Sequence, residues 1–215
     1  EERARTSALF CGHAVTCIPN PINTNLFKPR NRQEARSRCL LPQDKKLMLF
    51  GSVKITDKRK GIDYLIESCR LLADKHPELR EQLGVVVFGN QSQQLENLLP
   101  FKVYPLNFVS NEHQLVNIYN AVDIFVTPSL EENLPNTIME AMACGIPCVG
   151  FNVGGIPDDD RPSAQRVCGT IQIIRRFCQR HLLDIDRPGL SQPLRTSLPK
   201  SRHSLFGEHD CQKIY

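Results

Sequence analysis

The sequence predicts an α/β fold in which a parallel sheet carries helices on both of its faces. Three observations lead to this prediction: short unbroken apolar runs, amphipathic helical patterns between those runs, and glycine or polar residues where the runs end. A strand that is buried on both faces reads as a continuous apolar run. Strands that alternate with helices imply right-handed crossovers and parallel pairing. The predicted sheet is therefore Rossmann-like, and ligands are expected beyond the carboxyl ends of its strands.

The predicted strands of this sheet are the apolar runs at residues 47–53, 85–89, 103–109, 122–127 and 147–151. Pro105 interrupts the third run. Because proline has no N–H to give to a strand ladder, we expect this strand at an edge or in an irregular part of the sheet. A further apolar run at 15–18 predicts a short strand that precedes a proline-rich turn.

Helical patterns fill the gaps between these strands. Residues 111–120 predict a short helix that turns Tyr119 inward, and residues 136–144 predict a helix that ends at Gly145. The charged stretch 28–46 predicts a loop and a short helix. The longest pattern has apolar residues at helical spacing among charged ones, at Ile62, Leu65, Ile66, Cys69, Leu72 and Leu79.

Length and composition describe one globular domain with a segment on either side. Residues 1–27 are expected to form an entry segment, 28–158 to form the domain, and 159–215 to form an aberrant, disordered tail. No apolar run approaches the roughly 18 residues that cross a bilayer. The first residues do not form a signal peptide, and the chain lacks a starting Met, so we expect it to begin inside a longer protein.

Charge and cysteine content indicate which partners and which cellular compartment the sequence favours. The net charge of +4 suits phosphate or anionic lipid, but it is too mild to indicate a nucleic-acid partner. The nine cysteines include no CxxC pair, and Cys69, Cys144 and Cys148 lie in apolar contexts. These features favour a reducing cytoplasm over a disulfide framework or a zinc site. The histidines lack the spacing of metal ligands, so no metal site is predicted.

A basic run, Lys54-Ile-Thr-Asp-Lys-Arg-Lys-Gly61, follows the first predicted strand and precedes a helix. The free N–H groups and the dipole of a helix N-terminus already favour anions. The run is therefore a candidate diphosphate clamp, with Lys60 as its main cation. A solvated run of surface charges is the alternative interpretation.

Glycines follow two other predicted strands. Gly89 ends the second strand, where the absence of a side chain would let a ligand approach the backbone, although an ordinary turn explains it equally well. Gly154 and Gly155 follow the last strand, and their backbone N–H groups could meet a ligand oxygen. A flexible turn is the alternative there.

The strongest motif joins a loop, a helix and a buried strand between Pro128 and Gly150. Glu132 lies in the loop, and Glu140 lies about one turn inside the helix that follows. Two acids in these places suit the hydroxyls of a sugar nucleotide, and the helix start is a second candidate phosphate site, with Asn or Thr available as a cap. Both acids could instead be surface charges, but the small residues Ala141, Ala143 and Gly145 favour a helix that packs closely on the sheet.

These motifs resemble the group 1 family of retaining GT-B glycosyltransferases, specifically their C-terminal, donor-binding domain. The long central motif is specific, and the others gain weight from their order along residues 15–157. The resemblance rests on IPNPIN at 18–23, KRKG at 58–61, VFGN at 87–90, DIFVTPSLEENLPNTIMEAMACGIPCV at 123–149 and GGIP at 154–157.

The resemblance implies a role for each matched residue. Lys60 would hold the donor diphosphate, Glu132 would act on the transferred sugar as the catalytic residue, and Glu140 would bind the ribose. Catalysis would be electrostatic, because cations and amides stabilise the departing nucleoside diphosphate, with no metal or other cofactor. The implied donor-binding residues are Lys60, Arg59, Gly89, Asn133, Leu134, Pro135, Glu140, Gly154 and Gly155.

The family implies transfer of a sugar from a nucleotide-diphosphate-sugar to a glycan or lipid-linked acceptor. Such an enzyme is expected in the cytoplasm, with peripheral association at the inner face of the membrane, in polysaccharide biosynthesis. Two departures from the family matter. Ser52 occupies a place where the family often has an arginine, so Lys54 or Arg59 would have to substitute. The acceptor-binding domain is missing, so the incomplete GT-B fold is expected to be inactive alone.

Two alternatives remain open at this stage. One is a non-catalytic fragment that binds nucleotide sugars, and the other is a GT-B-type sugar-nucleotide epimerase. A related phosphorylase would need a lysine for pyridoxal phosphate, and no such site is evident in the sequence.

The family pattern stops after Pro157. Codons for residues 159–184, read from their second base, permit the peptide MTDHLHNGYVAQYKSSEDFANGIYWT, which continues the family pattern. Our hypothesis is a one-base insertion near codon 158. The alternative is a genuine basic tail that binds membrane or nucleic acid.

Overall fold

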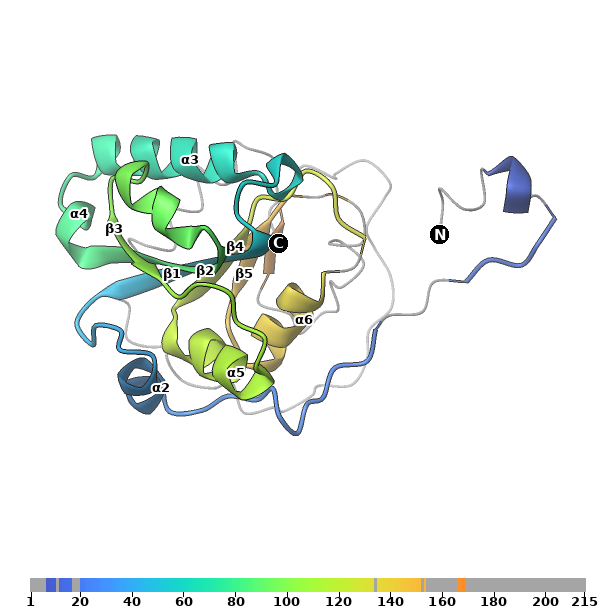
Figure 1. Ribbon diagram of the computed structural model, residues 1–215, viewed down its shortest axis with the longest axis horizontal. Helices are drawn as coiled ribbons and strands as arrows, with labels where there is room; N and C mark the ends of the chain where they lie inside the picture. The colour runs from blue at the N-terminus through green and yellow to red at the C-terminus, as the bar shows by residue number, and fades with distance from the viewer. Residues whose placement is uncertain are drawn as a thin grey trace, which may run out of the picture.

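The computed structural model describes residues 7–10, 12–16, 20–133, 135–151 and 153, together with the backbone of 166–168. Within these residues the chain forms a sheet of six strands in the order β3-β2-β1-β4-β5-β6 (Figure 1). All neighbouring strands pair in parallel. The strands are β1 (Lys46–Lys54), β2 (Leu83–Asn90), β3 (Lys102–Pro105), β4 (Ile124–Thr127), β5 (Cys148–Gly150) and β6 (Arg166–Cys168).

Helices cover both faces of this sheet, as the sequence predicts. Helix α3 lies along one face, and α5 and α6 lie on the other (Figure 1). The α-helices are α2 (Arg32–Arg38), α3 (Ile62–Lys75), α4 (Leu79–Gln82), α5 (Glu112–Ala121) and α6 (Asn136–Ala143), and the short 3-10 helices are η1 (Ala8–Phe10), η2 (Lys58–Lys60) and η3 (Ser92–Asn97).

Side chains of the central strands alternate between two hydrophobic cores. In β1, Met48 and Phe50 pack toward α3, whereas Leu47 and Leu49 pack toward α5 and α6. All four are at most 2% exposed. Because both faces of the strand are covered, every position must be apolar, which explains the unbroken apolar run in the sequence.

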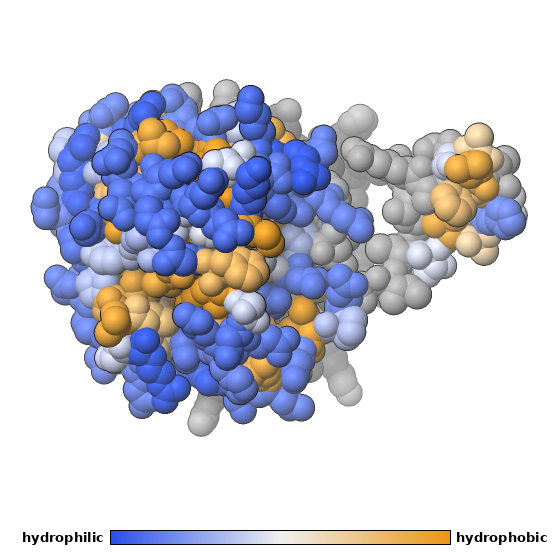
Figure 2. Space-filling view, viewed as in Figure 1, coloured by the Kyte–Doolittle hydropathy of each residue, from blue (hydrophilic) through white to orange (hydrophobic). Residues whose placement is uncertain are grey.

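One edge strand of the sheet was predicted from the sequence, and the strand at the opposite edge was not. Strand β3 lies at one edge, where Pro105 predicted it. Most of the face seen in Figure 2 is hydrophilic, and a hydrophobic band crosses it between α3 and α5, over the region of β3. At the opposite edge, the backbone of 166–168 forms β6 and pairs with β5. The rest of 159–215 lies outside the described residues, so the aberrant, disordered tail stays a prediction there.

The N-terminal segment differs from its prediction as well. Val15 and Thr16 form no strand, and residues 17–18 of the same predicted strand lie outside the described part of the chain. The prolines that follow fix an extended backbone without requiring a ladder partner, so an apolar run alone was weak support for a strand.

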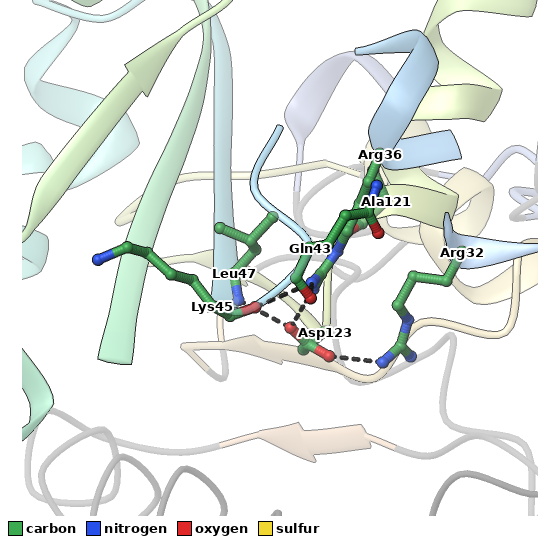
Figure 3. Close-up of polar contacts among 7 residues, drawn as sticks. All are labelled: Arg32, Arg36, Gln43, Lys45, Leu47, Ala121 and Asp123. Atoms are coloured by element: carbon green, nitrogen blue, oxygen red, sulfur yellow. Dashed lines mark hydrogen bonds and ion pairs between the residues drawn. The ribbon is translucent and has the colours of Figure 1, made fainter. Parts of the chain in front are cut away.

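A network of charged residues lies at the end of the sheet where β1 and β4 begin (Figure 3). Asp123 accepts hydrogen bonds from Arg32 at 2.6 Å, from Arg36 at 2.9 Å and from the backbone N–H of Leu47 at 2.7 Å. Three further N–H groups of the Arg36 guanidinium donate to the backbone carbonyl oxygens of Ala121, Gln43 and Lys45. Burial lowers the pKa of Arg36, and the charge of Asp123 opposes that effect. The network ties α2 to the start of two central strands, at the end of the sheet opposite the predicted site.

Candidate functional site

The strand order reverses between β1 and β4. Strands β2 and β3 continue the sheet on one side of this pair, and β5 and β6 continue it on the other. In open parallel sheets, the connections that leave such a point diverge and form a crevice beyond the carboxyl ends of the strands. The segment 55–61 leaves β1 here, and the segment 128–135 leaves β4. These two segments hold Lys60 and Glu132.

Backbone contacts hold the two segments together. Gly61 has a φ of +69°, and a Cβ at this position would lie 1.8 Å from the carbonyl oxygen of Pro128. Only glycine tolerates both the left-handed backbone and so close an approach. Two residues away in each segment, the N–H of Leu130 donates to the carbonyl oxygen of Arg59 at 2.7 Å. The Lys-Gly pair, weak as a sequence motif, therefore fixes the basic turn against the acidic loop.

Lys60 and Glu132 form an ion pair between the two segments. The Nζ of Lys60 donates to Oε1 of Glu132 at 2.5 Å, although the residues are 72 positions apart. The side chain of Lys60 is 30% exposed and that of Glu132 is 11% exposed. The main predicted cation and the first predicted acid thus meet where solvent or a ligand can still reach the lysine.

Arg59 is placed differently from Lys60. Its guanidinium pairs with Asp57 at 2.8 Å, and its side chain is 67% exposed. Hydrogen bonds from Arg59 hold the pKa of Asp57 below its ordinary value, and the same pairing raises the pKa of Arg59. Asp57 also caps η2 by accepting from the N–H of Arg59. Arg59 therefore supports the turn that carries Lys60, and its direct ion pair is with Asp57, whereas Glu132 acts on it only through its charge.

The start of α6 lies at the end of the acidic loop. Pro135 is the residue before the first helical turn, and no side chain caps it. The expectation that Asn136 or Thr137 acts as the cap is therefore wrong, because both lie within the helix. The side chain of Asn136 instead accepts a hydrogen bond from Asn20 at 2.9 Å. An uncapped helix start leaves backbone N–H groups to be satisfied by water or an anion.

Glu140 is held from within the core. The hydroxyl of Tyr119 donates to its Oε2 at 2.8 Å. The ring of Tyr119 is fully buried and lies edge-on to Phe88 and Phe125. Burial raises the pKa of Glu140, and the hydrogen bond from Tyr119 opposes that rise. Burial and the nearby carboxylate raise the pKa of Tyr119 well above its ordinary value, so the phenol keeps its proton and donates a hydrogen bond to Glu140.

The remaining predicted residues have separate explanations or lie outside the description. Gly89 has a φ of +135°, and a Cβ there would lie 1.8 Å from the carbonyl oxygen of Ser52. Packing against β1 therefore requires this glycine whether or not a ligand binds. Ser52, at the place of the expected arginine, is buried and donates to the carbonyl oxygen of Lys54. Asn133 is exposed, and Leu134, Gly154 and Gly155 lie outside the described residues.

The sequence identified Lys60, Glu132 and Glu140 as site residues but did not show which groups contact them. Tyr119 was expected to face inward, but nothing in the sequence joined it to Glu140. Asn20 and Pro128 likewise gave no signal of their contacts. In the described part of the chain, no group of three or more His, Cys, Asp or Glu residues could hold a metal ion, and no helix is long and apolar enough to cross a membrane.

Comparison with known proteins points to one family. A family model described as "Glycosyl transferases group 1" matches residues 44–169. The D-inositol 3-phosphate glycosyltransferase of Streptosporangium roseum is 30% identical over 154 residues, which are 65% of this chain and 34% of that protein. The chain thus spans about a third of the length of the curated relatives that it matches.

Solved structures share the fold. The C-terminal domain of a group 1 family glycosyl transferase from Francisella tularensis superposes with a TM-score of 0.59 at 22% identity, covering 77% of this chain and 89% of that one. Anabaena HepE in complex with UDP and glucose gives a TM-score of 0.59 at 20% identity, covering 77% of this chain and 46% of that one.

Proposed function

The chain belongs to the glycosyl transferases group 1 family, and from this premise we propose that it is the part of a glycosyltransferase that binds a nucleotide-diphosphate-sugar donor. The observation that carries the proposal is the pairing of Lys60 with Glu132 at the point where the strand order reverses. A cation and an acid meet there, beside a helix start that no side chain caps. A molecule with an anionic diphosphate next to a polyhydroxylated sugar matches that pattern of charge and hydrogen bonding. The complex of Anabaena HepE with UDP and glucose supports this class of ligand.

In the proposed complex, Lys60 and the backbone amides at the start of α6 bind the donor diphosphate. Glu132 accepts hydrogen bonds from the sugar hydroxyls, and Glu140 accepts them from the ribose hydroxyls. Because Lys60 and Glu132 are direct neighbours, the bond between sugar and diphosphate would lie next to both. The two charged groups would then hold opposite sides of the bond that breaks.

The proposed reaction needs no covalent chemistry from the protein. An acceptor hydroxyl forms a bond to the anomeric carbon as the bond from that carbon to the diphosphate breaks, and the hydroxyl proton passes to an oxygen of the departing diphosphate. The bonding electrons leave with the diphosphate. Lys60 and the helix amides stabilise that growing negative charge, which is the kind of electrostatic effect that lowers barriers most in a preorganised site.

The acceptor belongs to the finer part of the proposal. We propose a glycan or lipid-linked acceptor that reaches this site from a further domain, with the whole enzyme associating peripherally with the cytoplasmic face of the membrane. The described residues then supply the donor half of the site, and this chain alone would bind donor without completing transfer.

Titration calorimetry of the 215-residue chain with UDP-glucose, GDP-mannose and ADP-glucose tests the donor site. One donor is expected to bind. Lys60→Ala should weaken it about tenfold or more, because a charge-assisted hydrogen bond contributes about 1.5–3 kcal/mol. Glu140→Ala should also weaken binding. Lys75→Ala is the matched control, since Lys75 is an exposed lysine at the far end of α3.

The outcomes separate two failures. If a donor binds but neither Lys60→Ala nor Glu140→Ala changes its affinity, the site assignment is wrong. If none of the three donors binds to the wild-type chain, the proposed function itself is wrong.

A further inference from the structure

The second acid of the central motif has a partner that the proposed function does not use. Tyr119 lies 21 residues before Glu140, on α5, and its hydroxyl donates to Oε2 of Glu140 at 2.8 Å. Oε1 of Glu140 is not part of this bond. A carboxylate that is to accept hydrogen bonds from two neighbouring hydroxyls must be fixed in rotation, and a single bond from a rigid neighbour achieves that.

Tyr119 is rigid for reasons of packing. Its side chain is fully buried, and its ring meets Phe27, Phe88 and Phe125 at centroid distances of 6.4, 6.5 and 6.0 Å. Two of these contacts are edge-on and the one with Phe27 is tilted, and such packing leaves the ring few alternative positions. The phenol therefore presents its hydroxyl at one place, beside Glu140 on α6.

A purely structural role would not require the hydroxyl. Phenylalanine fills almost the same volume and would keep all three ring contacts. The hydroxyl costs desolvation at a fully buried position, and its bond to Glu140 offsets that cost. Among the described residues, this hydrogen bond is the contact that distinguishes tyrosine from phenylalanine at this position.

We propose that Tyr119 is a positioning residue for ribose recognition: its hydroxyl fixes the carboxylate of Glu140 in the rotation that receives the ribose hydroxyls of the donor. This inference rests on the proposed function, because it assumes that Glu140 binds the donor ribose. It adds a residue from a separate helix to the donor site and assigns it a task.

The electrostatic surroundings of Glu140 support the geometry. In the described part of the chain, the other titratable groups that interact with this pair are Glu112 on α5, Cys144 just after α6 and Cys148 on β5, and Glu112 raises the pKa of Glu140. Burial raises it further, and Tyr119 is the group that lowers it. Loss of the hydroxyl should therefore make Glu140 both less fixed and easier to protonate.

The first test needs no ligand. Carbon-13 NMR titration of the Glu140 carboxyl in the 215-residue chain should give a higher pKa in Tyr119→Phe than in the wild type, by about one pH unit for the loss of a hydrogen bond to a charged group. Tyr104→Phe is the matched control, because Tyr104 lies on β3 and interacts electrostatically with Asp44 rather than Glu140. An unchanged pKa in Tyr119→Phe overturns the proposal.

The second test reads the ribose directly. Calorimetry compares the affinities of UDP, GDP and ADP with those of their 2′-deoxy forms. The wild type and Tyr104→Phe should prefer the ribose form of the favoured nucleotide about tenfold, and in Tyr119→Phe that preference should fall toward one. A general loss of folding would weaken both forms equally and leave the preference intact.

The two tests distinguish the possible failures. A preference that persists in Tyr119→Phe refutes the positioning role while the proposed donor site stands. If the wild-type chain binds none of these nucleotides, the proposed function fails, and the ribose role fails with it, even where the NMR titration confirms the hydrogen bond.

Discussion

Removal of the Asp123 carboxylate should cost more stability than any other single ionic change in the network of Figure 3. In Asp123→Ala, Arg36 keeps its charge but loses its counter-ion. The two side chains are 5% and 7% exposed, so water cannot replace the lost partner without rearrangement of the chain. Removing one member of a buried ion pair typically costs about 3–5 kcal/mol.

The structure sets the magnitude within that range. Arg36 retains three bonds to backbone carbonyl oxygens, which still stabilise its charge and favour the lower end, about 3 kcal/mol. The N–H of Leu47 also loses its acceptor, and a buried donor without a partner costs about 1–3 kcal/mol. The expected loss is therefore about 4 kcal/mol, a large part of the roughly 5–15 kcal/mol that stabilises an ordinary domain.

Urea denaturation followed by circular dichroism measures this loss. Asp74→Ala provides the matched control, because Asp74 also pairs with an arginine, at 3.7 Å, but with side-chain exposures of 74% and 47%. Such a surface pair is worth about 1 kcal/mol at most. If Asp123→Ala loses no more than Asp74→Ala, the buried network is not the stabilising feature inferred here.

Three further predictions address the site and the tail. Gly61→Ala should lower the free energy of unfolding by more than the roughly 1–2 kcal/mol of left-handed strain, because its Cβ would also meet Pro128. Gly12→Ala is the control for strain alone, since Gly12 has a φ of +83° and open space around it. Equal losses of stability in the two variants would contradict the close contact with Pro128. Because folding raises the pKa of Glu140, this group stabilises the fold fully at pH values below its ordinary pKa of 4.5, and that stabilisation is lost as pH rises through the folded pKa. The wild type should therefore lose stability relative to Glu140→Gln across that pH range. Parallel plots of stability against pH for the two proteins would contradict this prediction. Sequencing the coding DNA should show that the frame beginning at the second base of codon 159 encodes MTDHLHNGYVAQYKSSEDFANGIYWT, and any other peptide there ends the insertion hypothesis.

Most of the sheet could be predicted because burial on both faces leaves a simple trace. The alternation of Leu47 and Leu49 toward one core with Met48 and Phe50 toward the other cannot be read from the sequence, but its consequence, an unbroken apolar run, can. Pro105 likewise located an edge. The order of the strands could not be predicted, because the pairing of β1 with β4 skips two strands and depends on contacts far apart along the chain.

The candidate site was predictable in its parts and not in its contacts. Lys60 and Glu132 each follow a strand of the same sheet, so their approach was a reasonable expectation. The pairing of Arg59 with Asp57 was not expected, because an acid inside a basic run looks like one more solvated charge. Gly89 shows the opposite problem: the sequence offered a ligand or a turn, whereas the carbonyl oxygen of Ser52 accounts for it.

Glu132 and Glu140, the two acids of the central motif, have hydrogen-bond partners that a bound donor would affect differently. Glu132 is paired with Lys60, the cation that a diphosphate would attract, so donor binding in the proposed mode makes Lys60 divide its hydrogen bonds between Glu132 and the phosphate. Glu140 is paired with Tyr119, a neutral and fully buried donor that no ligand competes for. In that proposed mode, the first acid would change its interactions when the donor arrives, as a group acting near the breaking bond must. The second would keep its partner and its orientation throughout, as the proposed ribose-binding group should.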